Sequence, residues 1–176
     1  DRDEEGNIYG GWDLRVELKN LNISNHKVWF KTIDPIIYVT YSILNNYCPW
    51  EKLEWITDDT TMIDILKKIA FINIKKIPGG ERTYEPAVWW DYEKNKEIVL
   101  KQINYYKPDI IICGNTLRYL LKDLQINEKD LVQLDSVKYI IRDNTIIINA
   151  YHPQQTRITK EKYFNDIINA VKKIVS

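Results

Sequence analysis

The chain has 176 residues, of which 44% are hydrophobic and 28% charged, enough for one globular domain with a substantial core and too few to expect two. Lys and Arg together number 25, as do Asp and Glu, so no overall charge draws the chain to nucleic acid or to an anionic membrane. The longest uncharged stretch, residues 35–50, contains polar side chains and falls short of the roughly 18–20 apolar residues of a membrane span.

Cys48 and Cys113 are too few for a four-thiolate metal site or an iron–sulfur cluster. We expect buried, reduced thiols and a cytoplasmic location, with a disulfide or ligand role as the alternative. The acidic start, Asp1 to Glu5, has neither the basic nor the apolar region of a signal peptide. A first strand, with which an α/β domain normally opens, is expected to precede Asp1.

The first seventy residues are predicted to be mainly helical. A glycine-punctuated loop at 6–12 is followed by a pattern at 14–23 that fits a short helix. Asp34 precedes Pro35 as an N-cap residue precedes the first helical position, which predicts a helix from there to about Asn46. Thr60 or Thr61 is expected to cap a further helix. Its inward face is expected to contain Met62, Ile63, Leu66 and Ile69.

From residue 70 onward, predicted strands alternate with helices. Apolar runs at 70–74 and 109–114 predict buried strands, and the second is typical of a central parallel strand. Residues 137–142 and 145–150 predict two more strands around a turn at Asp143-Asn144.

Amphipathic helices are expected at 91–106, 117–124 and 159–175. The inward stripe of the first is expected to be Ile98, Leu100, Ile103 and Tyr106. The alternation of strands and helices predicts one α/β domain over residues 1–176, a three-layer α/β/α sandwich with a central, mostly parallel sheet.

Ligands of such sheets bind beyond the carboxyl ends of the strands, which directs attention to residues 73–76, 114–116 and 151–153. His152 precedes Pro153, which restricts it to extended backbone geometry and favours a rigidly held side chain. It either takes part in chemistry or caps a loop by a hydrogen bond. Asn73 interrupts an apolar run, and its amide either bonds the surrounding backbone or presents a donor and an acceptor to a ligand.

Gly114, Asn115 and Thr116 follow the clearest strand and open a helix. The free N–H groups of a helix start can bind an anion, and an ordinary N-cap explains the same residues. Basic residues gather after two of the proposed strands and either grip phosphates or are solvated surface charge. They are Lys75, Lys76 and Arg82 in one group and Arg157, Lys160 and Lys162 in the other.

Together these segments resemble the core of the uracil-DNA glycosylase superfamily, especially its iron–sulfur branch of bacteria and archaea, although the chain lacks the cluster cysteines. Residues 72–78 resemble the family's "TNVVK…P" strand, and 108–116 its "P.iiv.LG..A" strand and turn. Residues 149–154 resemble the "t.HPS" motif, with Gln154 where the family has Ser. Residues 5–11 resemble the "GRPFVG" segment. The family's first motif, which positions the attacking water, would lie before Asp1.

The resemblance implies roles for individual residues. Tyr9 would stack on a flipped base, Asn73 would read the pyrimidine edge, and His152 would stabilise negative charge on the departing base. The loop of Gln154, Gln155 and Arg157 would press into DNA beside the extruded nucleotide.

The resemblance thus implies a DNA-repair hydrolase that excises uracil or a related base, binds DNA and uses neither metal nor cofactor. Two alternatives remain open. One is a module of the same fold that binds nucleic acid or a nucleobase without catalysis, which the Gln154 difference favours. The other is a protein-interaction module, which the neutral net charge favours.

Overall fold

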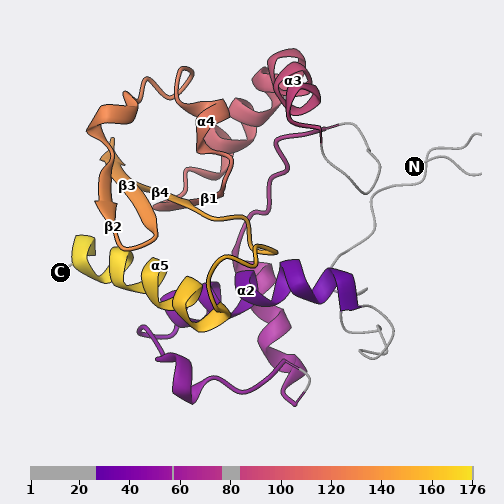
Figure 1. The fold of residues 1–176 in the computed structure, drawn as a ribbon, viewed down its shortest axis with the longest axis vertical. Helices are drawn as coiled ribbons and strands as arrows, with labels where there is room; N and C mark the ends of the chain where they lie inside the picture. Colours follow the sequence, from indigo (N-terminus) through magenta and orange to yellow (C-terminus); the bar gives the residue numbers. More distant parts are fainter. Residues whose placement is uncertain (1–26, 57, 77–83, 176) are drawn as a thin grey trace, which may run out of the picture.

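The computed structural model describes residues 27–56, 58–76 and 84–175 (Figure 1). Two short 3-10 turns, η2 (Trp50–Lys52) and η4 (Glu128–Asp130), connect the longer elements. The remaining elements, in chain order, are α2 (Lys27–Leu44), η3 (Thr60–Lys68), α3 (Glu85–Tyr106), β1 (Ile110–Gly114), α4 (Leu117–Leu120), β2 (Val132–Leu134), β3 (Val137–Arg142), β4 (Thr145–Ala150) and α5 (Lys160–Val175).

The four strands of the described residues form one mixed sheet in the order β1-β4-β3-β2. Strands β1 and β4 are parallel, with Ile110 opposite Ile146 and Gly114 opposite Ala150. Strand β3 is antiparallel to both β4 and β2. The chain is therefore α/β as expected, but the expectation of a mostly parallel sheet is not confirmed, because only one of these three pairings is parallel.

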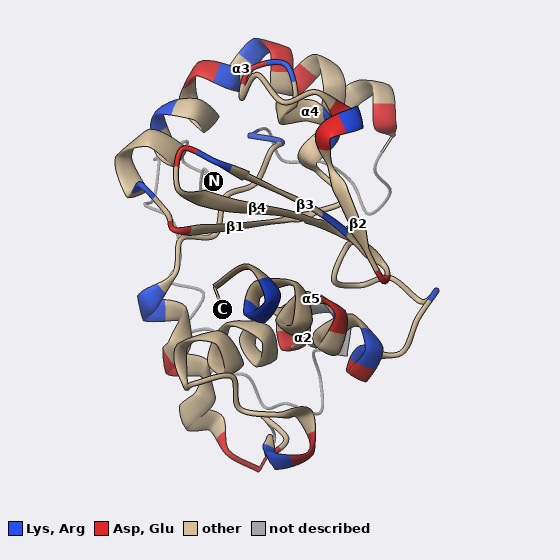
Figure 2. Cartoon of the chain, turned by 90° about the vertical axis from the view of Figure 1, so that its left-hand side faces the viewer, with Lys and Arg blue, Asp and Glu red and all other residues tan. Residues whose placement is uncertain are grey.

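Helices cover both faces of this sheet (Figure 2). On β4, Ile146, Ile148 and Ala150 point to one side and join a core cluster with α2, η3 and α5. Ile147 points to the other side and joins a second cluster with α3 and α4. The alternation of side chains along a strand thus divides the core into two parts that share β4.

The predicted strand at 70–74 is wrong. The segment is irregular, and Phe71 and Asn73 are exposed while Ile74 is buried. An apolar run becomes a strand only if another strand pairs with its backbone, and no described strand lies beside this one. Among the described residues, β1 consequently forms an edge of the sheet, and its Ile112 is partly exposed.

The predicted start of the first long helix is also wrong. Helix α2 begins at Lys27 and continues through Pro35, which therefore sits inside the helix. An internal proline removes one hydrogen bond and costs about 3 kcal/mol. Burial of Ile33, Ile37 and Tyr38 in the core offsets that cost.

Helix α3 begins six residues before the predicted start, and its inward face differs from the expected one. Ile98 and Tyr106 are exposed, whereas Val88, Tyr92 and Val99 are buried. The helix carries apolar residues on its outer side as well, so the apolar pattern alone does not identify the core face.

The remaining elements differ less from prediction. The hairpin of β3 and β4 turns at Asp143 and Asn144 as expected, both with positive φ. Element η3 is a 3-10 helix whose N-cap is Asp59, which accepts the Thr61 N–H at 2.8 Å. Helix α4 ends at Leu120, and strand β2 was not predicted.

Several expectations lie outside the described residues: the loop at 6–12 with Tyr9, the short helix at 14–23, and Arg82. Cys48 and Cys113 are free, and only Cys113 is fully buried. No helix within the described ranges is both long and apolar enough to cross a bilayer.

Candidate functional site

The carboxyl ends of β1 and β4 bring two of the predicted site segments together. A Cβ placed on Gly114 would lie 3.0 Å from Pro153 Cδ and 3.7 Å from His152 Cα. The Asn115 N–H donates to Ala150 O at 2.7 Å. The parallel register of β1 and β4 creates this contact, and only a residue without a side chain fits at position 114 without displacing Pro153.

His152 is exposed beside this contact, and one of its ring nitrogens is already engaged. Nδ1 accepts the backbone N–H of Gln154 at 3.1 Å. Partial burial of the ring lowers its pKa, because removal from water disfavours the charged form. A neutral ring whose Nδ1 is an acceptor carries its proton on Nε2. The donor of the neutral His152 ring is therefore Nε2–H.

The loop after His152 is braced by Gln155. Its Oε1 accepts the N–H groups of Arg157 at 2.6 Å and Ile158 at 2.9 Å, and its Nε2 donates to Ile158 O at 2.9 Å. The Gln155 side chain thus supports the loop from within and is not free to reach DNA. Arg157 is exposed and lies over the Tyr151 ring at 5.7 Å, and Gln154 is exposed as well.

The turn at 114–116 has fewer free N–H donors for an anion than its sequence predicts. The Asn115 N–H is already bonded to Cys113 O and Ala150 O, and Asn115 adopts a left-handed φ of 61°. Helix α4 has only four residues, so the dipole behind this turn is small. Burial raises the pKa of the Cys113 thiol to about 12, despite its hydrogen bond with Thr116, so it is no nucleophile. The anion-binding role stays a prediction that this geometry weakens.

The segment containing Asn73 lies on the α3 side of the sheet. Ile74 belongs to the core cluster of Cys113 and Leu117, which are at the carboxyl end of β1. The Lys76 N–H donates to Asp91 Oδ2 at 2.7 Å, and its Nζ donates to Gln102 Oε1 at 2.7 Å.

The predicted site residues of this segment are Asn73, Lys75 and Lys76. Asn73 is exposed, and no hydrogen bond joins it to His152. The Lys76 ammonium is occupied within the fold, and burial lowers its pKa. Lys75 is partly buried. The structure therefore brings His152 to the turn at 114–116, while Asn73 lies exposed on the segment whose Ile74 packs with Cys113 and Leu117.

Aromatic residues at the start of α3 were missed by the sequence-based site prediction. Tyr84, Trp89 and Trp90 are exposed, and Trp89 packs edge-on against Tyr119 of α4 at 4.7 Å. Arg118 of α4 pairs with Glu85 at 2.5 Å. The available signal was the Trp89-Trp90 pair close to Pro86, which marks the helix start.

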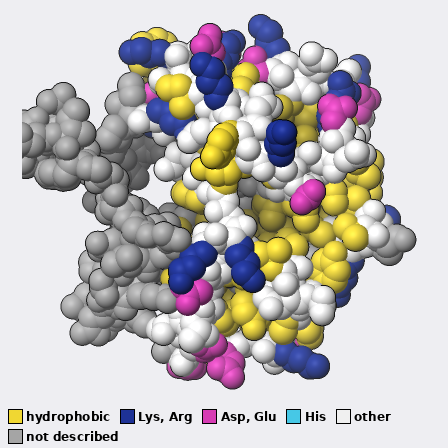
Figure 3. Space-filling model, turned by 180° about the vertical axis from the view of Figure 1, so that it is seen from behind, with side chains coloured by type: hydrophobic (Ala, Val, Ile, Leu, Met, Phe, Trp, Pro, Cys, Tyr) yellow, Lys and Arg dark blue, Asp and Glu magenta, His cyan; other side chains and the backbone are white. Residues whose placement is uncertain are grey.

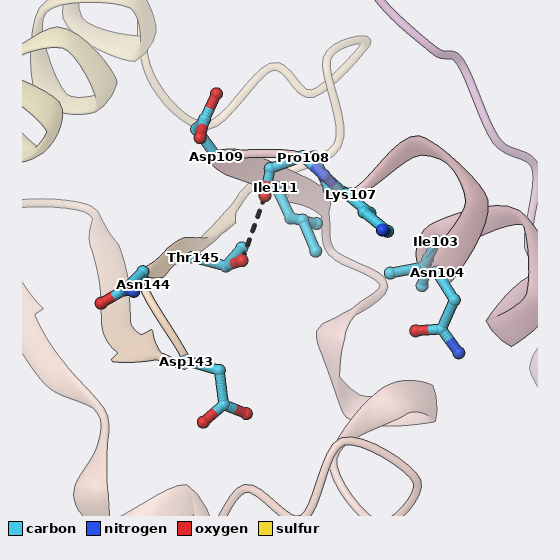
Figure 4. A pocket seen from close by; sticks show the side chains of 9 residues that line it. All are labelled: Ile103, Asn104, Lys107, Pro108, Asp109, Ile111, Asp143, Asn144 and Thr145. Carbon is cyan, nitrogen blue, oxygen red and sulfur yellow. Dashed lines mark hydrogen bonds between the residues drawn. The ribbon is translucent and has the colours of Figure 1, made fainter.

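A depression lies at the other end of the strands (Figure 4). It is open, has a volume of about 490 Å³, and is lined by residues of the α3–β1 and β3–β4 connections. There the Thr145 hydroxyl donates to Pro108 O at 3.1 Å. The lining also contains one basic residue, Lys107, and the acidic residue Asp143. Parallel strands usually present ligands at their carboxyl ends, so this depression is not the predicted site.

Figure 3 shows the molecule from behind, with apolar side chains gathered in a hollow across its middle.

Among the described residues, no three His, Cys, Asp or Glu side chains are grouped closely enough to hold a metal ion.

Comparisons of the chain with protein-family models, with curated proteins and with solved structures find no match.

Proposed function

We propose that this chain is a divergent member of the uracil-DNA glycosylase superfamily that removes a uracil or related base from DNA by hydrolysing the N-glycosidic bond. The observation that carries the proposal is His152, an exposed residue just after β4 whose Nδ1 accepts the Gln154 N–H, which leaves Nε2–H as the donor of the neutral ring. The finer fold proposal, a three-layer sandwich of that superfamily, is supported by helices on both faces of the sheet.

The chemistry suits this donor. When the bond between base and sugar breaks, the electron pair remains on the pyrimidine and negative charge collects on its carbonyl oxygens. A neutral imidazole N–H, held in place before the reaction, stabilises that charge more in the transition state than in the ground state. The hydrogen bond at Nδ1 and the Pro153 contact with Gly114 limit reorientation of the ring.

Base release from DNA tests the proposal. Single- and double-stranded oligomers containing uracil or other modified bases are incubated with the full-length protein, and abasic sites are detected by alkaline cleavage. We expect release that slows about 100- to 1000-fold in His152→Ala, in line with the loss of one preorganised donor. His26→Ala is the matched control and should release base at the wild-type rate. No release on this panel by the wild-type protein would contradict catalysis.

A second candidate is a module that binds nucleic acid or a nucleobase without cleaving it. The observations that favour it are Gln154 at the position after His-Pro and the exposed Asn73 on an irregular segment. Binding of single-stranded DNA without base release would support this candidate.

A further inference from the structure

The exposed aromatic residues of α3 lie at the same end of the sheet as His152. Only Lys107, Pro108 and Asp109 separate α3 from β1, so the two elements run in opposite directions and the start of α3 lies over the carboxyl end of β1 (Figure 2). The contacts with α4 agree, since Glu85 pairs with Arg118 and Trp89 packs on Tyr119. Helix α4 begins three residues after Gly114, which contacts the His152 loop.

The exposure of these rings is not explained by the core. Tyr84 is 72% exposed, Trp90 63% and Trp89 39%, although the inner face of α3 is already filled by Val88, Tyr92 and Val99. Large aromatic side chains gathered on a surface usually mark a binding site.

Cationic groups lie beside the rings. Lys94 Nζ is 5.0 Å from the centroid of the exposed Trp90 ring. The Arg118 guanidinium is 5.5 Å from the ring of Tyr119, which is buried and packs against the exposed Trp89. Exposed rings with adjacent cations match the two parts of a single-stranded nucleic acid, because bases stack on aromatic faces and phosphates take the cations. We call Tyr84, Trp89, Trp90, Lys94 and Arg118 the stacking surface.

We propose that the stacking surface binds unpaired bases of single-stranded DNA next to the nucleotide that reaches His152. The inference rests on the proposed function, and it names the substrate class of that site. A base inside a duplex has both faces covered by its neighbours and cannot stack on Trp90. Glu85 forms an ion pair with Arg118 and offsets its positive charge. The net charge of the stacking surface is therefore small, and we expect stacking to be the main source of affinity.

Fluorescence anisotropy of a labelled fifteen-nucleotide poly-dT strand, which contains no excisable base, measures this binding in the full-length protein. We expect Trp90→Ala to weaken the affinity about 5- to 100-fold and Trp90→Phe to retain most of it. Tyr105→Ala is the matched control, since Tyr105 is 81% exposed on the opposite end of the same helix, and it should change the affinity less than about twofold. Circular dichroism spectra are recorded to check that each variant is folded.

Two further readouts sharpen the test. A duplex of the same length should bind at least about tenfold more weakly. The logarithm of the affinity should fall with the logarithm of salt concentration at a slope of only about −0.7 to −1.4, as for one or two phosphates on a single strand.

Equal affinities of Trp90→Ala and wild type, or of single strand and duplex, would overturn the proposal. Self-association lost in Trp90→Ala with unchanged DNA affinity would assign the surface to a protein partner instead. Failure here is distinguishable from failure of the proposed function. If base release depends on His152 while Trp90→Ala binds normally, only the stacking surface is rejected. If Trp90→Ala loses affinity but no variant releases a base, only the glycosylase activity is rejected.

Discussion

At the scale of single residues, His152 combines two features that act in the same direction on its titration. Burial disfavours the charged ring, and protonation of Nδ1 would break the hydrogen bond from the Gln154 N–H. Both favour the neutral form, so the pKa of His152 in the folded protein should lie below about 6.5, the ordinary value for histidine.

This pKa is measured by titrating the ring proton signals in NMR spectra. His26 is the second histidine of the chain, and loss of a signal in His152→Gln assigns the two. Because the folded pKa is the lower one, the stability that His152 contributes is present above the unfolded pKa and is lost as the pH falls through the folded pKa. An assigned pKa above the ordinary value would contradict the tautomer on which the proposed chemistry depends.

At the scale of elements, Asp91 connects the Asn73–Lys76 segment to α3. Asp91 is 2% exposed, and its carboxylate accepts the Lys76 backbone N–H at 2.7 Å, beside the bond from Lys76 Nζ to Gln102 of the same helix. Asp91→Ala should lower the free energy of unfolding by about 1.5–3 kcal/mol, since it removes a charged acceptor and leaves a donor unpaired. Asp91→Asn keeps one acceptor and should cost less.

Denaturant unfolding measures the loss, and hydrogen exchange at the Lys76 amide locates it. Glu97→Ala, an exposed change on the same helix, is the control and should leave both unchanged. If Lys76 exchanges at the wild-type rate in Asp91→Ala, the carboxylate does not hold the segment.

The elements also indicate which parts of the fold can be predicted from sequence. The hairpin of β3 and β4 was predictable, because Asp143 and Asn144 favour the left-handed conformations of a tight turn between two apolar runs. Strand β1 was predictable from its continuous apolar run. Segment 70–74 has a similar run, but whether a run pairs depends on a neighbouring strand that the local sequence does not specify.

For the candidate site, the junction of Gly114 with His152 and Pro153 could be predicted. It requires only that β1 and β4 be parallel neighbours. The stacking surface could not be predicted, because it depends on which face of α3 is buried. Ile98 and Tyr106 fit the expected inward stripe as well as Val88 and Val99 fit the observed one. Packing against α4 and β1, which hydrophobic spacing does not encode, decides between them.

At the scale of the whole molecule, β4 is the element shared by both halves of the core. Ile147 and Ile148 are adjacent in sequence and 3% and 0% exposed, yet Ile147 packs with α3 and α4 while Ile148 packs with α2 and α5. The backbone of β4 pairs with β1 on one side and with β3 on the other. If β4 loses its packing on one face of the sheet, its side chains on the other face are displaced as well. The two helical layers should therefore unfold together as one domain.

Paired substitutions test this cooperativity. Ile147→Ala and Ile148→Ala should each lower the free energy of unfolding by about 2–5 kcal/mol, because each removes three buried carbons and leaves a cavity. Each should shift one single transition, seen at the same denaturant concentration by circular dichroism and by tryptophan fluorescence. The fluorescence covers both sides of the sheet, because the six tryptophans include Trp89, which packs on α4, and Trp50, which packs on Phe164 of α5. Ile141→Ala on β3, which is 55% exposed, is the control and should cost less than about 0.5 kcal/mol.

Two separate transitions in Ile147→Ala, with the α3 side melting first, would mean that the layers are independent units and that the single-domain prediction is wrong. The stacking surface, which is on α3 and α4, could then loosen without unfolding of the other layer, and it would not be held at a fixed position relative to His152.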